Sequence, residues 1–262
     1  MKVVLFCGGL GTRLRNYSEI IPKPMVPIGY RPILWHIMKY YAHYGHKDFI
    51  LALGYKADVI KEYFTNYNET TSNDFIYSKG GKNIELLSSD IDDWKITFVD
   101  TGENSNIGMR LMKVKEFVQN EDYFLANYAD GVTDMHLPTM IDNFTSQKDL
   151  IASFMTYRPK SSFHTVESNK RGLVTKIQPM SYSKLWLNTG FFIFKPEFLN
   201  YMNYGDEIVE EPFQKLILEK KLSTHMYDGF WQPMDTFKDK MLFDKLQEKG
   251  DTPWKVWEKT EK

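Results

Sequence analysis

The sequence lacks most features that mark secreted, membrane or nucleic-acid-binding proteins. It has one cysteine, Cys7, so no disulfide can form within the chain, and we expect a cytoplasmic protein. No apolar run approaches the ~18 residues of a membrane span, and glycines interrupt the apolar start before a signal peptide could form. Lysine plus arginine (33) nearly balance aspartate plus glutamate (34), which argues against a nucleic acid or an anionic membrane as partner. Small-molecule partners are expected.

Several catalytic signatures are also missing. There is no G-x-x-x-x-G-K-[ST] phosphate loop and no G-x-S-x-G nucleophile elbow. His43 and His46 flank Gly45 without a cysteine or glutamate to complete a zinc site. Cys7 lies in an apolar run, where a thiol is a poor nucleophile. Zinc chemistry and covalent catalysis are therefore not indicated.

What the chain does have is a globular composition, with 42% hydrophobic and 26% charged residues over 262 positions. In the first half, apolar strands alternate with amphipathic helices, which predicts an α/β fold with a mostly parallel sheet. A ligand would bind at the carboxyl ends of its strands. The expected strands are 3–7, 49–53, 96–99 and 123–128, and the expected helices are 33–44, 59–67 and 111–118.

The second half has closely spaced strands, which predicts an antiparallel subregion. The expected strands are 151–157, 163–167, 173–178 and 187–194, followed by helices at 206–221 and 236–249. The polar stretch 68–93 interrupts the α/β alternation and is interpreted as an insertion or flap, or as a plain surface hairpin.

A glycine-rich loop follows the first strand directly. Gly8, Gly9 and Gly11 would let backbone N–H groups approach phosphate oxygens, while Thr12 and Arg13 add a hydroxyl and a guanidinium. The third glycine of a dinucleotide fingerprint is absent. The loop is either a triphosphate cradle or an ordinary tight turn.

Lys23 follows shortly, between Pro22 and Pro24. The prolines stiffen the backbone, so the ammonium is presented from a fixed loop, as suits a phosphate contact. A surface lysine in a turn is the alternative, and the nearby Arg13 favours the phosphate role.

Two aspartates lie where a metal could bind. Asp130 follows strand 123–128, at a carboxyl end, and Asp235 comes directly before a predicted helix. Two carboxylates converging near a phosphate would hold Mg²⁺, which prefers oxygen ligands. Asp235 could instead be a helix N-cap, and Asp134 is a third candidate that also fits a turn.

Taken together, these motifs resemble the bacterial sugar-nucleotide pyrophosphorylases, and most closely their cytidylyl-transferring branch. The resemblance runs nearly end to end and includes the segments 8–14, 22–26, 32–38, 99–102, 130–131, 229–236 and 253–257.

The resemblance implies a single Rossmann-like nucleotidyltransferase domain over 1–262. Residues 1–135 would mainly bind the nucleotide and 150–262 the acceptor. It implies in-line attack by a sugar 1-phosphate, most closely glucose 1-phosphate, on the α-phosphorus of CTP, giving a CDP-sugar and pyrophosphate. Homo-oligomers are common in this family.

The resemblance also implies roles for individual residues. Arg13 and Lys23 would act in catalysis, and Asp130 and Asp235 would bind Mg²⁺. Asn188 would face the acceptor. The implied nucleotide contacts are Gly8, Gly9, Gly11, Thr12, Arg13, Lys23, Arg110 and Asp130.

The acceptor half departs from the family pattern. Where the family carries Glu-Lys-Pro, whose lysine grips the sugar phosphate, this chain has Gln178 before Pro179, so Lys184 or Lys176 would have to replace that lysine. Ala129 stands where the family has a glycine, directly before Asp130.

Two alternative functions stay open. One is a cytidylyltransferase for another sugar phosphate or a non-sugar phosphate, and the other is a nucleotide-binding regulator without catalysis.

Overall fold

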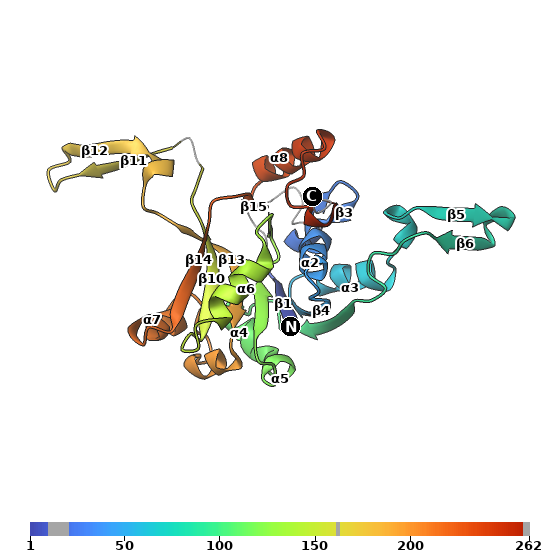
Figure 1. Ribbon diagram of the computed structural model, residues 1–262, viewed down its shortest axis with the longest axis horizontal. Coiled ribbons are helices and arrows are strands. Elements are labelled where there is room, and N and C mark those ends of the chain that lie inside the picture. The colour runs from blue at the N-terminus through green and yellow to red at the C-terminus, as the bar shows by residue number, and fades with distance from the viewer. Residues whose placement is uncertain (10–20, 161–162, 259–262) are drawn as a thin grey trace.

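The structure is a computed structural model that describes residues 1–9, 21–160 and 163–258. Helices flank a central twisted sheet, and two hairpins project from opposite sides of this body (Figure 1). Within the described residues the sheet has seven strands in the order β14-β10-β13-β8-β1-β4-β7. Their bounds are β1 Lys2–Cys7, β4 Asp48–Leu53, β7 Lys95–Asp100, β8 Phe124–Asn127, β10 Ala152–Tyr157, β13 Leu187–Phe194 and β14 Leu222–Tyr227.

The predicted mostly parallel α/β sheet is confirmed. β8, β1, β4 and β7 are mutually parallel, and β10 is parallel to β14. β13 runs antiparallel to both of its neighbours, β8 and β10. The carboxyl ends of β1, β8 and β10 therefore lie at one edge of the sheet.

Both faces of the sheet are covered, which explains the continuous apolar run of β1. Val3 and Leu5 point into one core cluster, and Val4 and Phe6 point into the other. The described α-helices are α2 Ile33–His43, α3 Ala57–Thr65, α4 Ile107–Lys113, α5 Lys115–Val118, α6 Leu137–Thr145, α7 Glu211–Leu218 and α8 Phe237–Glu248. None of these described helices is long and apolar enough to cross a membrane.

The ends of α2 follow from the sequence. Pro32 is its N-cap, and Gly45 follows its carboxyl end with φ of +84°. The N–H groups of Gly45 and His46 donate to the carbonyl oxygens of Ala42 and Tyr41, at 2.9 and 3.0 Å, so they satisfy carbonyls that the helix leaves open.

Some predicted boundaries were wrong. The helix expected over 206–221 is shorter and consists of α7 alone. Pro212 lies in the first turn of α7, where proline is tolerated, and a proline would interrupt a helix that began several residues earlier. Helix α6 was not anticipated, although Leu137, Met140 and Phe144 recur at helical spacing and are buried.

The stretch 68–93 contains a hairpin, β5 (Phe75–Ser78) and β6 (Asn83–Leu86), which projects from the body (Figure 1). The base of this insertion is fixed by the nearly buried carboxylate of Asp90. That carboxylate forms a 3.0 Å ion pair with Lys39, accepts from Tyr67 at 3.1 Å, and accepts a short hydrogen bond from Ser72. The insertion is therefore anchored at its base and exposed at its tip.

The second projecting hairpin consists of β11 (His164–Ser168) and β12 (Val174–Pro179). We call this hairpin the β11–β12 arm; it extends away from β8 and β1 (Figure 1). Two short ribbons complete the strands: β2 (Pro27–Ile28) with β3 (Arg31–Pro32), and β9 (Gly131–Thr133) with β15 (Trp231–Pro233).

Candidate active site

Three charged side chains from distant parts of the chain meet at the carboxyl edge of the sheet. The Nζ atom of Lys23 lies 2.7 Å from Oδ2 of Asp130 and 2.5 Å from Oδ1 of Asp235. The three side chains are 15%, 26% and 33% exposed, so the cluster is open to a ligand from one side. The two aspartates therefore share one ammonium group.

Local backbone structure sets these positions. Lys23 begins the 3-10 helix η2 (Lys23–Met25), which includes Pro24. Ala129 lies between β8 and Asp130 with φ of +59°, a left-handed conformation that redirects the chain and that glycine adopts more easily.

The ribbon of β9 and β15 brings the second aspartate beside the first. β9 begins directly after Asp130, β15 pairs with it, and the N–H of Met234 donates to the carbonyl oxygen of Asp130 at 2.7 Å. Helix α8 starts immediately afterwards, but its N-cap is Thr236, which forms a capping box with Asp239. The N-cap interpretation of Asp235 is therefore wrong.

The electrostatics of the cluster favour a charged lysine. Burial alone would lower the pKa of Lys23, but the charges and hydrogen bonds of Asp130 and Asp235 outweigh it and raise the pKa above its ordinary value. The ammonium thus remains protonated at neutral pH and offsets the repulsion between two neighbouring carboxylates.

Arg110, predicted as a nucleotide contact, lies against Gly8 and is 1% exposed. Its guanidinium donates to backbone carbonyls and to one hydroxyl: Gly8 O at 2.9 Å, Leu53 O at 3.1 Å, Gly102 O at 2.9 Å, Glu103 O at 3.2 Å and Thr101 Oγ1 at 2.6 Å. These bonds tie the loop after β1 to the ends of β4 and β7.

Two glycines make room for this guanidinium. A Cβ on Gly8 would lie 2.1 Å from Cζ of Arg110, and one on Gly54 would lie 2.5 Å from Nη1. A Cβ on Gly9 would meet nothing within 4 Å. Gly8 is thus required by its contact with Arg110, a role that the sequence alone did not reveal. Gly11, Thr12 and Arg13 lie outside the described residues.

On the acceptor side, Asn188 lies at the start of β13. Its Oδ1 accepts from the N–H of Gly190 at 3.0 Å, and its Nδ2 lies 3.5 Å from the hydroxyl of Tyr128. The other predicted or alternative acceptor residues are two lysines of the second half. Lys184 is exposed between β12 and β13, and Lys176 pairs with Glu167 at 3.7 Å on the β11–β12 arm.

Asp134, the third candidate carboxylate, has a structural role. Its Oδ1 accepts from the N–H of Phe230 at 2.8 Å and from the hydroxyl of Tyr227. It therefore fastens the loop before β15, as expected for a turn residue.

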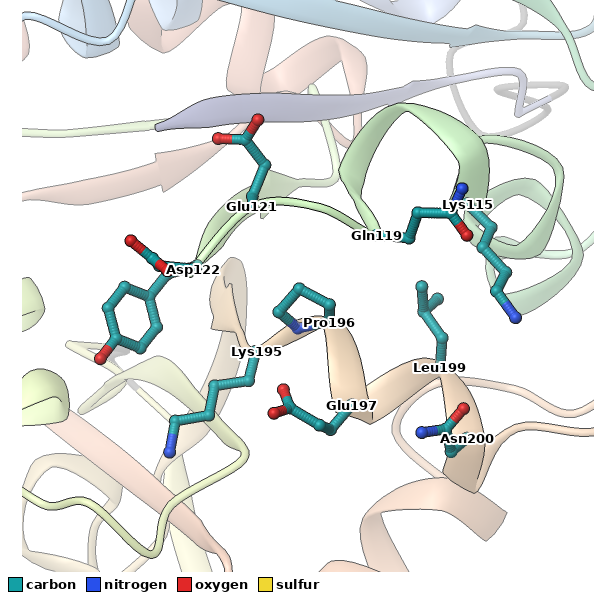
Figure 2. Close-up of a pocket in the computed structure, with 10 residues that line it drawn as sticks. Lys115, Gln119, Glu121, Asp122, Lys195, Pro196, Glu197, Leu199 and Asn200 are labelled. Atoms are coloured by element: carbon teal, nitrogen blue, oxygen red, sulfur yellow. The ribbon is translucent and has the colours of Figure 1, made fainter.

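A surface hollow of about 700 Å³ lies elsewhere, between α5, the start of β8 and the end of β13 (Figure 2). Its rim carries both signs of charge, including Lys115, Lys195, Glu121 and Glu197. Lys195 follows the carboxyl end of the antiparallel β13 and Glu121 precedes β8, so the hollow lies at the edge opposite the Lys23 cluster.

Comparisons with known proteins agree with this architecture. Residues 2–244 match the family described as nucleotidyl transferase, so this chain belongs to that family. It is 40% identical over 260 residues to glucose-1-phosphate cytidylyltransferase of Salmonella typhimurium, covering 98% of this chain and 100% of the relative, and it is similar to the Salmonella typhi enzyme of that name to the same extent.

A solved structure confirms the fold. A UDP-glucose pyrophosphorylase complexed with UDP-glucose superposes with a TM-score of 0.68 at 14% identity, over 95% of this chain and 98% of that one. The predicted nucleotidyltransferase fold is thus confirmed.

Proposed function

We propose that this chain transfers a cytidylyl group from CTP to glucose 1-phosphate, giving CDP-glucose and pyrophosphate. The observation that carries the proposal is the meeting of Lys23, Asp130 and Asp235 at the carboxyl edge of the sheet, the same edge at which β1 ends. The near full-length similarity to glucose-1-phosphate cytidylyltransferases supports the choice of substrates.

Asp130 and Asp235 would hold Mg²⁺. The fit rests on the donor set: two carboxylates directed at one ammonium already provide a site for positive charge, and Mg²⁺ commonly takes one or two carboxylates, with waters and phosphate oxygens completing its shell. Among the described residues no third histidine, cysteine, aspartate or glutamate joins them. When bound, the ion would offset negative charge on the phosphates.

Lys23 would exchange partners during binding. Without substrate its ammonium neutralises the two carboxylates. With nucleotide present it would turn toward the phosphates, where Arg13 and the N–H groups of Gly8 and Gly9 would add further donors. Phosphoryl chemistry needs little covalent work from the protein, so rate would come from alignment and charge neutralisation.

Arg110 would act as a positioning residue. Its buried hydrogen bond to the carbonyl of Gly8 fixes the start of the loop, and its positive charge lies below the proposed phosphate site. Residues 1–135 would thus mainly bind nucleotide, and 150–262 the acceptor, with Asn188 facing the sugar.

A second candidate function is the same cytidylyl transfer to a different phosphorylated acceptor. It is favoured by the position of Gln178, which replaces the family lysine and lies on the β11–β12 arm. A regulator without catalysis is disfavoured, because Lys23, Asp130 and Asp235 all remain in contact.

The predicted homo-oligomer fits the two projecting hairpins. On β5 and β6, one face carries Phe75, Tyr77, Ile84 and Leu86, all substantially exposed. A lone two-stranded hairpin with an uncovered apolar face is marginally stable, so we expect this face to pack against a second copy of the chain.

Product mass spectrometry tests the proposed reaction. The protein is incubated with Mg²⁺, CTP and a panel of phosphorylated metabolites including glucose 1-phosphate. CDP-glucose should be the fastest-formed product. A faster product from another phosphate would support the second candidate, and CTP binding without any product would support the regulator.

A further inference from the structure

Arg158 follows the carboxyl end of β10, the same edge of the sheet as the Lys23 cluster. Its guanidinium carbon lies 4.7 Å from the centroid of the Trp186 ring, a cation–π contact that orients the group. Its Nε atom is buried and has no hydrogen-bond partner among the described residues. It forms an ion pair with Oδ1 of Asp228 at 3.8 Å, which is too long for a hydrogen bond.

A wall of side chains links the end of β10, which Arg158 follows, to the segment that carries Asp130. The ring of Tyr157 lies 5.4 Å from that of Trp231. Trp231 also packs closely against Gly131, the residue after Asp130. A Cβ added to Gly131 would lie only 3.1 Å from the indole nitrogen of Trp231. On the other side, Thr156 pairs in register with Asn188, whose amide lies 3.5 Å from the Tyr128 hydroxyl.

Two more polar groups of this wall lack partners. The hydroxyl oxygen of Thr156, a residue only 5% exposed, and the indole nitrogen of Trp231 form no hydrogen bond among the described residues. Leaving buried donors unpaired is costly, and such groups are commonly satisfied by a ligand or by water. With the Nε of Arg158, three buried polar groups near the carboxyl end of β10 thus lack partners among the described residues.

We propose that Arg158 binds the phosphate of the acceptor. This inference rests on the proposed function. The guanidinium offers a planar set of donors that matches a phosphate.

Neighbouring lysines are placed less well for this role. The ammonium of Lys160 donates to the carbonyl oxygens of Asp228 and Gly229, at 2.6 and 3.0 Å, so it fastens the loop before β15. Lys184 is exposed. A purely structural role for Arg158 would rest on its contacts with Trp186 and Asp228. The ion pair contributes little stability, because the side chains of Arg158 and Asp228 are 42% and 66% exposed.

The test measures KM separately for glucose 1-phosphate and CTP in wild type, Arg158→Gln and Arg158→Lys. Losing a charge-assisted contact to phosphate should raise KM for glucose 1-phosphate roughly 10- to 100-fold in Arg158→Gln. KM for CTP should stay within about twofold. Arg158→Lys should be intermediate, because it keeps the charge but loses the planar donor geometry.

Arg171→Gln is the matched control, since Arg171 is exposed in the turn of the β11–β12 arm and far along the hairpin from the wall. It should leave both KM values unchanged. An unchanged KM for glucose 1-phosphate in Arg158→Gln, or an equal rise for CTP, overturns the role of Arg158 while leaving the proposed function intact.

If wild type turns over another phosphate faster than glucose 1-phosphate, glucose 1-phosphate is not the acceptor. The KM values are then compared with the preferred phosphate, and they show whether Arg158 binds its phosphate group. If no phosphate is turned over, both proposals are overturned.

Discussion

The guanidinium of Arg110 lies directly under Gly8, and its Nη2 donates to the Gly8 carbonyl oxygen at 2.9 Å. The contact joins the first strand to a residue 102 positions further along the chain. Because Arg110 also bonds to the carbonyl oxygens of Leu53, the last residue of β4, and of Gly102 after β7, it joins Gly8 to the ends of two further parallel strands. A change at Gly8 should therefore affect the whole carboxyl edge.

Gly8→Ala tests this arrangement. The added methyl would overlap the Arg110 guanidinium, so we expect a loss of about 1 to 3 kcal/mol in the free energy of unfolding. Urea denaturation measures the change. Gly9→Ala is the control, because its methyl would meet open space. Equal stability of the two variants would contradict the required contact.

Asp235→Asn should separate catalysis from helix capping. We expect turnover to fall by about 100-fold or more, because one proposed Mg²⁺ ligand loses its charge, with little change in thermal stability. Thr236→Ala should do the reverse, costing about 1 kcal/mol of stability while keeping most activity. Steady-state kinetics and thermal melting together decide. Activity near wild type in Asp235→Asn would exclude the metal role.

Lys23→Gln should change the affinity of the free protein for Mg²⁺. In wild type the ammonium occupies the space between the two carboxylates and opposes a cation there. Its removal should tighten Mg²⁺ binding about tenfold in calorimetry without nucleotide, while turnover falls. Asp235→Asn is the control and should bind Mg²⁺ weakly. The same Mg²⁺ affinity in Lys23→Gln and wild type would count against a shared site.

The anchor of the insertion should be sensitive to acid. Burial alone would raise the pKa of Asp90, but its hydrogen bonds with Ser72 and Lys39 and the charge of Lys39 outweigh this and hold the pKa below its usual value. A carboxyl group whose pKa is depressed on folding stabilises the protein above its unfolded-state pKa of about 3.9, and this stability is lost as the pH falls through the folded-state value.

Asp90→Asn should therefore lower the free energy of unfolding by about 2 kcal/mol near pH 7, and the deficit should shrink below about pH 4. Urea denaturation from pH 3 to pH 7 measures it. Asp93→Asn, which removes an exposed partner of Lys47, should cost no more than about 1 kcal/mol. A deficit that stays constant into acid would refute the linkage.

The apolar face of the β5–β6 hairpin should control self-association. Ile84→Glu puts a charge on the face that also carries Tyr77, and it should reduce the molar mass measured by light scattering after gel filtration. Ile76→Glu lies on the opposite face, next to Glu85, and should leave the mass unchanged. Equal masses for both variants would mean that this face is not the contact.

Much of the fold could be predicted because its signals are local. The sheet strand at Lys2–Cys7 is a continuous apolar run, and α2 is bounded by a proline and a glycine. The strand β14 was missed because its residues are partly exposed and carry no clear alternation, and only pairing with β10 makes it a strand.

The candidate site could be predicted only in part. Asp130 could be predicted because ligands bind at the carboxyl ends of parallel strands. Lys23 could be predicted because the prolines on either side stiffen its backbone. Arg158 carried no sequence signal, because Trp186 and Asp228 reach it from separate segments. The burial of Arg110 was equally hidden, since its partners are mostly backbone carbonyls.

The two ion pairs of Lys23 join residues 107 and 212 positions apart. Contacts of such long sequence separation form late, after the intervening segments have closed. During translation, Asp235 emerges 212 residues after Lys23. A growing polypeptide would thus carry Lys23 long before both of its acidic partners are available, so this cluster could assemble only after Asp235 has been synthesised.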